Sequence, residues 1–158
     1  MMREAVVPTA VPRLSIIPST MDLSGLELQI GQARDRAYRL RNALVPLNEG
    51  KPGVTDFSYV LIDCPPSLNL LTVNAMAAAN AVLVPLQCEF FALEGLSQLL
   101  KTVDKVKGAL NPELSIHGIV LTMHDSRNNL SNQVVKDVRE FMGRKVYDTV
   151  IPRNVRIS

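Results

Sequence analysis

The apolar positions of this chain follow two patterns that alternate along its length. Short apolar runs at residues 14–18, 59–62, 81–86, 116–123 and 145–151 predict strands, and unbroken runs are typical of strands covered on both faces. Between them, apolar residues three and four positions apart predict helices over 23–43, over 67–79, before Asn111 and after Ser131, which could cap the last of them. Because strands that alternate with helices form βα units, the pattern predicts an α/β fold with a mainly parallel sheet and helices on both faces.

One of the predicted strands ends in an acid. Residues 59–62 lead into Asp63, and Pro65 and Pro66 then remove the N–H groups that a continuing strand would need. In open α/β sheets, ligands bind beyond the carboxyl ends of the strands, so Asp63 could hold a hydrated metal ion beside phosphates. The same carboxylate could instead cap the helix that follows, and on spacing alone the two roles have equal support.

Length and composition limit the number of domains. With 158 residues, of which 47% are hydrophobic, the chain can bury one substantial core. We expect a single domain over 1–158, in which 1–13 form a connector and 14–158 the α/β core. Cys64 and Cys88 form no C-x-x-C pair and lie among apolar neighbours, which predicts reduced, buried thiols rather than a disulfide or a metal site.

Charge and apolar stretches bear on location. The formal net charge of +2 does not by itself require a polyanionic partner. No apolar stretch is long enough to cross a bilayer, and the N-terminal residues lack the long apolar core of a secretion signal. A cytoplasmic protein without a membrane partner is therefore expected.

A glycine- and lysine-containing loop at 46–56 superficially resembles a phosphate-binding loop. Such loops place G-x-x-x-x-G-K-[ST] between a strand and a helix, so that backbone N–H groups converge on the phosphates. Here Pro52 follows Lys51 and removes an N–H, and no helical pattern begins. The loop is expected only to join the helix over 23–43 to the strand before Asp63.

Four blocks of sequence carry a resemblance to a known family. They read V-L-I-D-C-P-P-S-L at 60–68, V-P-L-Q-C-E-F-F-A-L-E-G at 84–95, L-T-M at 121–123 and I-P-R-N-V-R at 151–156. In this order they resemble the ParA/Soj chromosome- and plasmid-partition ATPases, and the similarity extends back to I-P-S-T-M-D-L-S-G at 17–25. The resemblance implies a P-loop NTPase-like fold, with ATP and Mg²⁺ as cofactors of the complete protein.

The resemblance also assigns roles to single residues. Asp63 matches the Walker B acid, which holds magnesium, usually through water. Gln87 and Glu89 match a loop that faces the nucleotide and the opposite subunit of an ATP-sandwiched homodimer, although ordinary loop polarity explains them equally well. The neighbourhood of the adenine pocket is matched by Thr122, Met123, Pro152 and Asn154.

Two arginines match positions at which dimers of this family grip the DNA backbone. They are Arg127 and Arg156, and either could instead be an ordinary solvated arginine. Because no base-reading module is visible, the resemblance implies non-specific DNA binding through phosphates. It further implies nucleoid association and a ParB-type partner that stimulates hydrolysis.

The sequence departs from the family pattern at its start. A deviant Walker A loop, K-G-G-x-x-K-T, and the aspartate that positions the attacking water are both absent from residues 1–158. We therefore expect an interior segment of a longer ATPase, lacking the Walker A lysines and not competent for catalysis alone. A truncated, non-catalytic relative that acts as an interaction module is the alternative.

Overall fold

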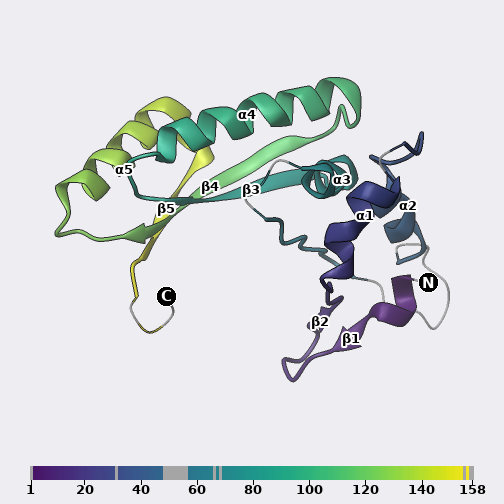
Figure 1. The fold of residues 1–158 in the computed structure, drawn as a ribbon. Coiled ribbons are helices and arrows are strands. Elements are labelled where there is room, and N and C mark those ends of the chain that lie inside the picture. The colour runs from purple at the N-terminus through teal and green to yellow at the C-terminus, as the bar shows by residue number, and fades with distance from the viewer. Residues whose placement is uncertain are drawn as a thin grey trace. The chain divides into compact units, whose positions relative to one another are not determined.

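The computed structural model describes residues 2–30, 32–47, 57–65, 67, 69–154 and 156. The chain folds as two compact units, Met1–Ala78 and Ala79–Ser158. Figure 1 follows the chain by colour, with the first unit running from purple through blue to teal at α3 and the second from teal through green to yellow. The single domain expected over 1–158 stays a prediction.

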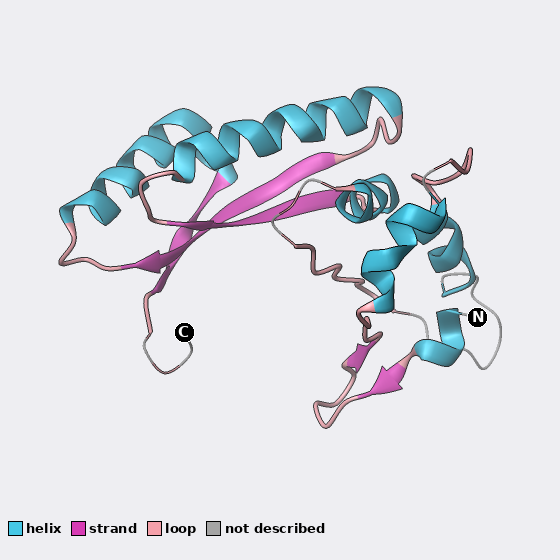
Figure 2. Ribbon diagram, viewed as in Figure 1, coloured by secondary structure: helices cyan, strands magenta, loops and turns pink. Residues whose placement is uncertain are grey.

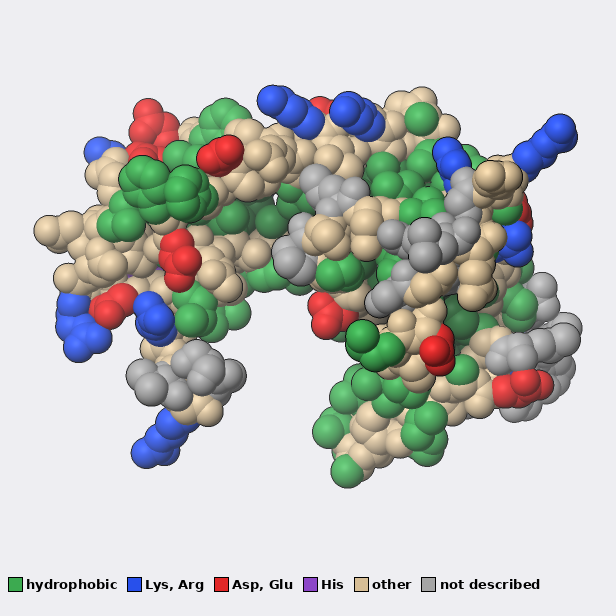
Figure 3. Space-filling model, in the orientation of Figure 1, with side chains coloured by type: hydrophobic (Ala, Val, Ile, Leu, Met, Phe, Trp, Pro, Cys, Tyr) green, Lys and Arg blue, Asp and Glu red, His purple; other side chains and the backbone are tan. Residues whose placement is uncertain are grey.

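The first unit is built from short elements. They are η1 (Met2–Ala5), β1 (Val7–Pro8), β2 (Ser15–Ile16), α1 (Asp22–Ile30), α2 (Arg39–Leu44), η2 (Val45–Leu47) and α3 (Leu70–Ala78). β1 and β2 pair antiparallel, with Val7 opposite Ile16, so the expected connector over 1–13 contains η1 and β1. The side chains of this hairpin are largely apolar and exposed, as the space-filling view shows (Figure 3).

The long helix predicted over 23–43 is wrong. The structure has two helices there, α1 and α2, separated by turns within 32–38 in which the Ala33 and Tyr38 amides donate to the Ile30 and Asp35 carbonyls. The predicted helix included Gly31, and glycine in a helix interior costs about 1 kcal/mol relative to alanine. Helices this short depend on tertiary packing rather than on propensity.

The strand predicted over 59–62 is also wrong. Residues 57–65 form neither helix nor strand, and Tyr59 and Leu61 are 87% and 90% exposed. A parallel strand is held by hydrogen bonds to a neighbour, and within the described residues no strand pairs with this segment. The segment 59–62 therefore has the apolar pattern of a strand but is hydrogen-bonded to no strand within the described residues.

A buried asparagine fastens α3 to the segment around α2. The Asn74 side chain donates to the Arg36 carbonyl at 2.7 Å and to the Leu70 carbonyl at 2.9 Å, and it accepts from the Leu40 amide at 3.2 Å. Asn74 is 5% exposed, so each of these bonds satisfies a group with little access to water. The polar contact thus fixes which face of α3 meets α2.

The second unit is an α/β layer, as predicted. It contains β3 (Ala81–Gln87), α4 (Ala92–Ala109), β4 (Ser115–His124), α5 (Asn129–Met142), η3 (Gly143–Lys145) and β5 (Val146–Pro152). The sheet order is β3-β4-β5, and both pairings are parallel (Figure 2). The strands predicted over 81–86, 116–123 and 145–151 are confirmed.

Helices α4 and α5 lie on the same face of this sheet (Figure 1). The buried core between them is contributed by all three strands and both helices; it contains Val84, Leu86, Cys88, Ala92, Leu96, Ile119, Leu121, Val134, Val138 and Val146. On β3 the alternate residue Leu83 is 50% exposed, although the run is apolar throughout. The core of this unit is therefore one-sided.

Two local expectations need correction. The N-cap of α5 is Asn128, whose side chain accepts from the Leu130 amide at 2.9 Å, whereas Ser131 is buried and its hydroxyl accepts from the Asp125 amide at 3.2 Å. Of the two reduced cysteines, Cys88 is buried as expected but Cys64 is exposed. Cys64 differs because the segment that carries it is not packed as a strand.

Candidate functional site

The carboxyl ends of three strands meet at one edge of the parallel sheet. β3 ends at Gln87, β4 at His124 and β5 at Pro152, and parallel pairing places these carboxyl ends at the same edge. The contact continues past β5, because the Arg153 amide donates to the His124 carbonyl at 2.9 Å. This is the edge at which open α/β sheets bind ligands.

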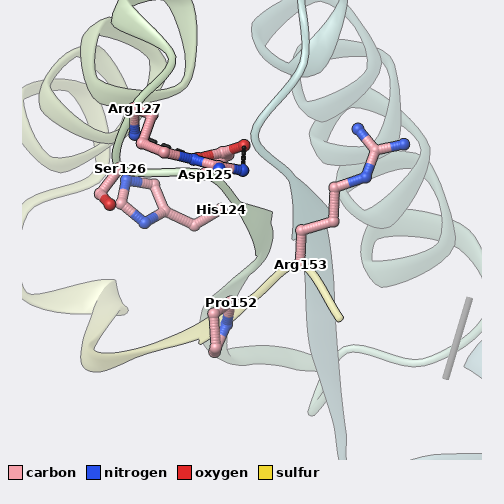
Figure 4. A pocket seen from close by; sticks show the side chains of 6 residues that line it. All are labelled: His124, Asp125, Ser126, Arg127, Pro152 and Arg153. Atoms are coloured by element: carbon pink, nitrogen blue, oxygen red, sulfur yellow. Dashed lines mark hydrogen bonds and ion pairs between the residues drawn. The ribbon is translucent and has the colours of Figure 1, made fainter. Parts of the chain in front are cut away.

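A cavity of about 230 Å³ opens at this edge. It is lined by His124, Asp125, Ser126, Arg127, Pro152 and Arg153 (Figure 4). Of the residues expected near an adenine pocket, Pro152 lines the cavity, while Thr122, Met123 and Asn154 lie beside its lining in sequence. The structure therefore brings the end of β4 and the end of β5 together, with His124 opposite Pro152, and the adenine role of these residues stays a prediction.

The backbone at the end of β4 is in an unusual conformation. Met123 has a φ of 55°, in the left-handed region that residues other than glycine seldom occupy. The carbonyl of the preceding residue, Thr122, accepts from the Cys88 amide at 3.0 Å. Backbone strain of this kind is concentrated at ligand sites, and here it turns the chain from the strand into the cavity wall.

Two of the residues that line the cavity form an ion pair. The Asp125 carboxylate accepts from Nε and Nη2 of Arg127, at 3.0 Å each, and from the Arg127 amide at 3.0 Å. These hydrogen bonds, with the nearby charges of Arg127 and Arg153, lower the pKa of Asp125 to about 2. They also raise the pKa of Arg127, so both groups stay charged at any pH near neutrality.

A second cavity, of about 420 Å³, lies between the end of β3 and the start of α4. Its lining includes both loop residues expected near the nucleotide and the opposite subunit, Gln87 and Glu89, which are exposed. The aromatic rings of Phe90 and Phe91 also line it, 73% and 70% exposed and in edge-to-face contact with centroids 5.1 Å apart. Two exposed phenylalanines beside a cavity are an apolar surface that the sequence pattern did not single out.

Asp63 belongs to the first unit. Asp63 is exposed. The pKa of the neighbouring Cys64 thiol is raised, mainly by burial of the thiol and secondly by the negative charge of Asp63. Within the described ranges, no three His, Cys, Asp or Glu side chains lie close enough together to hold a metal ion. Magnesium usually takes one or two protein carboxylates and completes its shell with water and phosphate, so a single exposed carboxylate fits such a role.

The predicted DNA-contacting arginines both lie in the second unit. Arg127 has a side chain 88% exposed, and Arg156 is exposed, with its amide donating to the Asn154 side chain at 2.9 Å. Sequence reasoning missed Arg153 and Asp125, which share the cavity with Arg127. The signal for Asp125 was its position two residues before Arg127, a spacing at which an aspartate folds back on the chain.

No helix within the described part of the chain is both long and apolar enough to cross a bilayer.

Comparison with known proteins identifies relatives over nearly the whole chain. The model of a family described as an AAA domain matches residues 1–116. The chain is 61% identical over 155 residues to the chromosome partitioning protein ParA of Caulobacter vibrioides, covering 98% of this chain and 57% of that protein. It is 48% identical over 150 residues to the sporulation initiation inhibitor protein Soj of Bacillus subtilis, covering 95% of this chain and 57% of that protein.

A solved structure agrees with the observed fold. Cobyrinic acid a,c-diamide synthase from Mycobacterium smegmatis, with bound ADP and magnesium, superposes with a TM-score of 0.85 at 38% identity, over 97% of this chain and 60% of that one. The chain thus spans little more than half the length of these proteins. With a match over most of its residues, the chain belongs to the AAA-domain family of this model, and its relatives there include the ParA and Soj partition proteins.

Proposed function

We propose that this chain is part of a partition ATPase that binds MgATP, forms a homodimer and binds DNA without regard to sequence. The observation that carries the proposal is the 61% identity, over 98% of the chain, to a protein named for chromosome partitioning. On this proposal residues 1–158 are one α/β domain of a longer cytoplasmic, nucleoid-associated protein, and a ParB-type partner stimulates its hydrolysis.

In the proposed ATPase, Asp63 positions magnesium. When bound, the metal neutralises charge on the transferring phosphoryl group. The contribution of Asp63 is a carboxylate that is exposed and can accept hydrogen bonds from metal-bound water. This donor chemistry supports the assignment, as does the presence of magnesium in the M. smegmatis relative.

The two cavities of the second unit suit the remaining nucleotide contacts. We assign the cavity lined by Pro152 to the adenine region, flanked by Thr122, Met123 and Asn154. The cavity lined by Gln87 and Glu89 is assigned to the loop that meets the opposite subunit. Both lie at the carboxyl ends of parallel strands, where the sheet exposes loops rather than a closed core.

DNA binding is assigned to Arg127 and Arg156. Both are exposed, and guanidinium groups suit phosphate because they present fixed N–H donors in pairs. If both arginines of each subunit contact phosphate in a dimer, the four contacts predict a slope of log affinity against log salt of about −3.6, at roughly 0.9 per contact.

The test is DNA binding by the full-length protein that carries this chain, with MgATP and a duplex of random sequence at several salt concentrations. The double variant Arg127→Ala, Arg156→Ala is expected to bind more weakly, with a slope closer to zero by as much as about 3.6. A matched control is Arg34→Ala, Arg41→Ala, which removes two arginines of the first unit. Unchanged affinity and slope in the Arg127, Arg156 variant would contradict the DNA assignment.

A further inference from the structure

We propose that Asp125 is an internal competitor of DNA phosphate: it holds Arg127 in an ion pair and thereby weakens DNA binding at that residue. The inference rests on the DNA role proposed for Arg127. Asp125 would set how tightly Arg127 binds DNA, because its carboxylate is paired with the Arg127 guanidinium.

The first step is the geometry of the pair. Oδ1 and Oδ2 of Asp125 accept from Nε and Nη2 of Arg127, both at 3.0 Å. This is the side-on edge of the guanidinium, one of the edges with which an arginine grips a phosphate through two parallel hydrogen bonds. Carboxylate and phosphate therefore compete for the same donors. Figure 4 shows the hydrogen bonds of the pair as dashed lines among the residues that line the cavity.

The backbone of Asp125 is held on both sides, whereas the Arg127 side chain extends into solvent. The Asp125 amide donates to the hydroxyl of Ser131, which is 2% exposed in α5, and the Asp125 carbonyl accepts from the Asn128 amide at 3.0 Å. The side chain of Asp125 is 29% exposed and that of Arg127 is 88% exposed. A phosphate can therefore reach Arg127, but Asp125 stays beside it as a fixed negative charge.

The third step is the charge balance at this edge. Arg153 lines the same cavity as the pair, so two cations and one anion face the solvent there. Asp125 largely cancels the charge of the Arg127 guanidinium. Its carboxylate also repels an approaching phosphate, because both are negative, and salt weakens this repulsion. Removing only the charge of Asp125 should therefore strengthen phosphate contact.

The experiment uses the full-length protein, MgATP and a random-sequence duplex, and compares Asp125→Asn with the unmodified protein. Asparagine keeps Oδ1, which accepts from the Arg127 amide, so the turn is retained. We expect DNA binding about two- to fivefold tighter at low salt, the range of an exposed ion pair, with the gain shrinking as salt rises. Far-UV circular dichroism and the thermal midpoint check that the variant folds.

Two further variants make the outcomes distinct. Asp148→Asn removes an equal charge from the ion pair that the exposed Asp148 forms with the half-buried Arg139, at 3.4 Å, and is expected to leave DNA binding nearly unchanged. Asp125→Asn combined with Arg127→Ala should lose the gain, since the gain acts through Arg127. Equal tightening by Asp148→Asn, or none by folded Asp125→Asn, overturns the competitor role. If Arg127→Ala alone binds DNA normally, the proposed DNA site itself is wrong.

Discussion

Replacing Leu121 by alanine is expected to lower the free energy of unfolding by about 3 kcal/mol, within the range of about 2–5 kcal/mol for buried leucines. Leu121 lies in the middle strand β4, is 0% exposed and belongs to the core that β3, β4 and β5 share with α4 and α5. Truncation removes apolar contacts and leaves a cavity that a close-packed sheet cannot collapse around. Urea unfolding followed by circular dichroism measures the change, with the denaturant slope unaltered.

The control for this prediction is Leu130→Ala. Leu130 stands in the first turn of α5 and is 42% exposed, and alanine has the better helix propensity, so its loss should change stability by less than about 0.5 kcal/mol. An equal effect of the two substitutions would mean that the second unit does not unfold around the core described.

Replacing Asp63 by asparagine is expected to slow MgATP hydrolysis by the full-length protein at least about a hundredfold, the scale of losing one electrostatic contact to a transition state. The amide has nearly the same shape but no charge, so on the proposed assignment hydrated magnesium would lose its protein carboxylate. The magnesium concentration for half-maximal hydrolysis should rise as well. Steady-state rates over a magnesium titration measure both effects.

Asp35→Asn is the matched control. Asp35 also lies in the first unit, and it pairs with Arg39 at 3.1 Å with both side chains about half exposed, so losing its charge should leave hydrolysis unaltered. Hydrolysis at the normal rate in Asp63→Asn would contradict the magnesium role of Asp63; a helix cap is not the alternative, because α3 begins at Leu70 and the Asn69 side chain accepts from the Thr72 amide at 3.1 Å.

The second unit was predictable from sequence because its signals are local and mutually consistent. The apolar run over 81–86 and the stripe that includes Leu96 and Val103 each specify an element by their own period, and each is found. The parallel order follows from the alternation of strand and helix. The expected meeting of the 122–123 and 152–154 segments followed from a resemblance rather than from periodicity.

The parts that failed depend on partners that no local pattern names. Residues 59–62 have the composition of a strand, but a ladder requires a neighbour, and none pairs with them among the described residues. Apolar residues recur at helical spacing over 23–43, but this spacing does not show where one helix ends and the next begins. Asp125 and Arg127 are separated by one residue, but the orientation of the pair at the cavity depends on Ser131 and on the register of β5.

The hydrogen bond from the Arg153 amide to the His124 carbonyl has a consequence for solvent exchange. Arg153 is exposed and lies beyond the last residue of β5, so its amide would exchange with deuterium at once if it were not bonded. We expect it to exchange slowly, at a rate set by local separation of the two segments that wall the cavity. Site-resolved exchange of this one amide, compared with core amides of β4, would then time the opening of the cavity; exchange at the unprotected rate would mean that its walls are not joined.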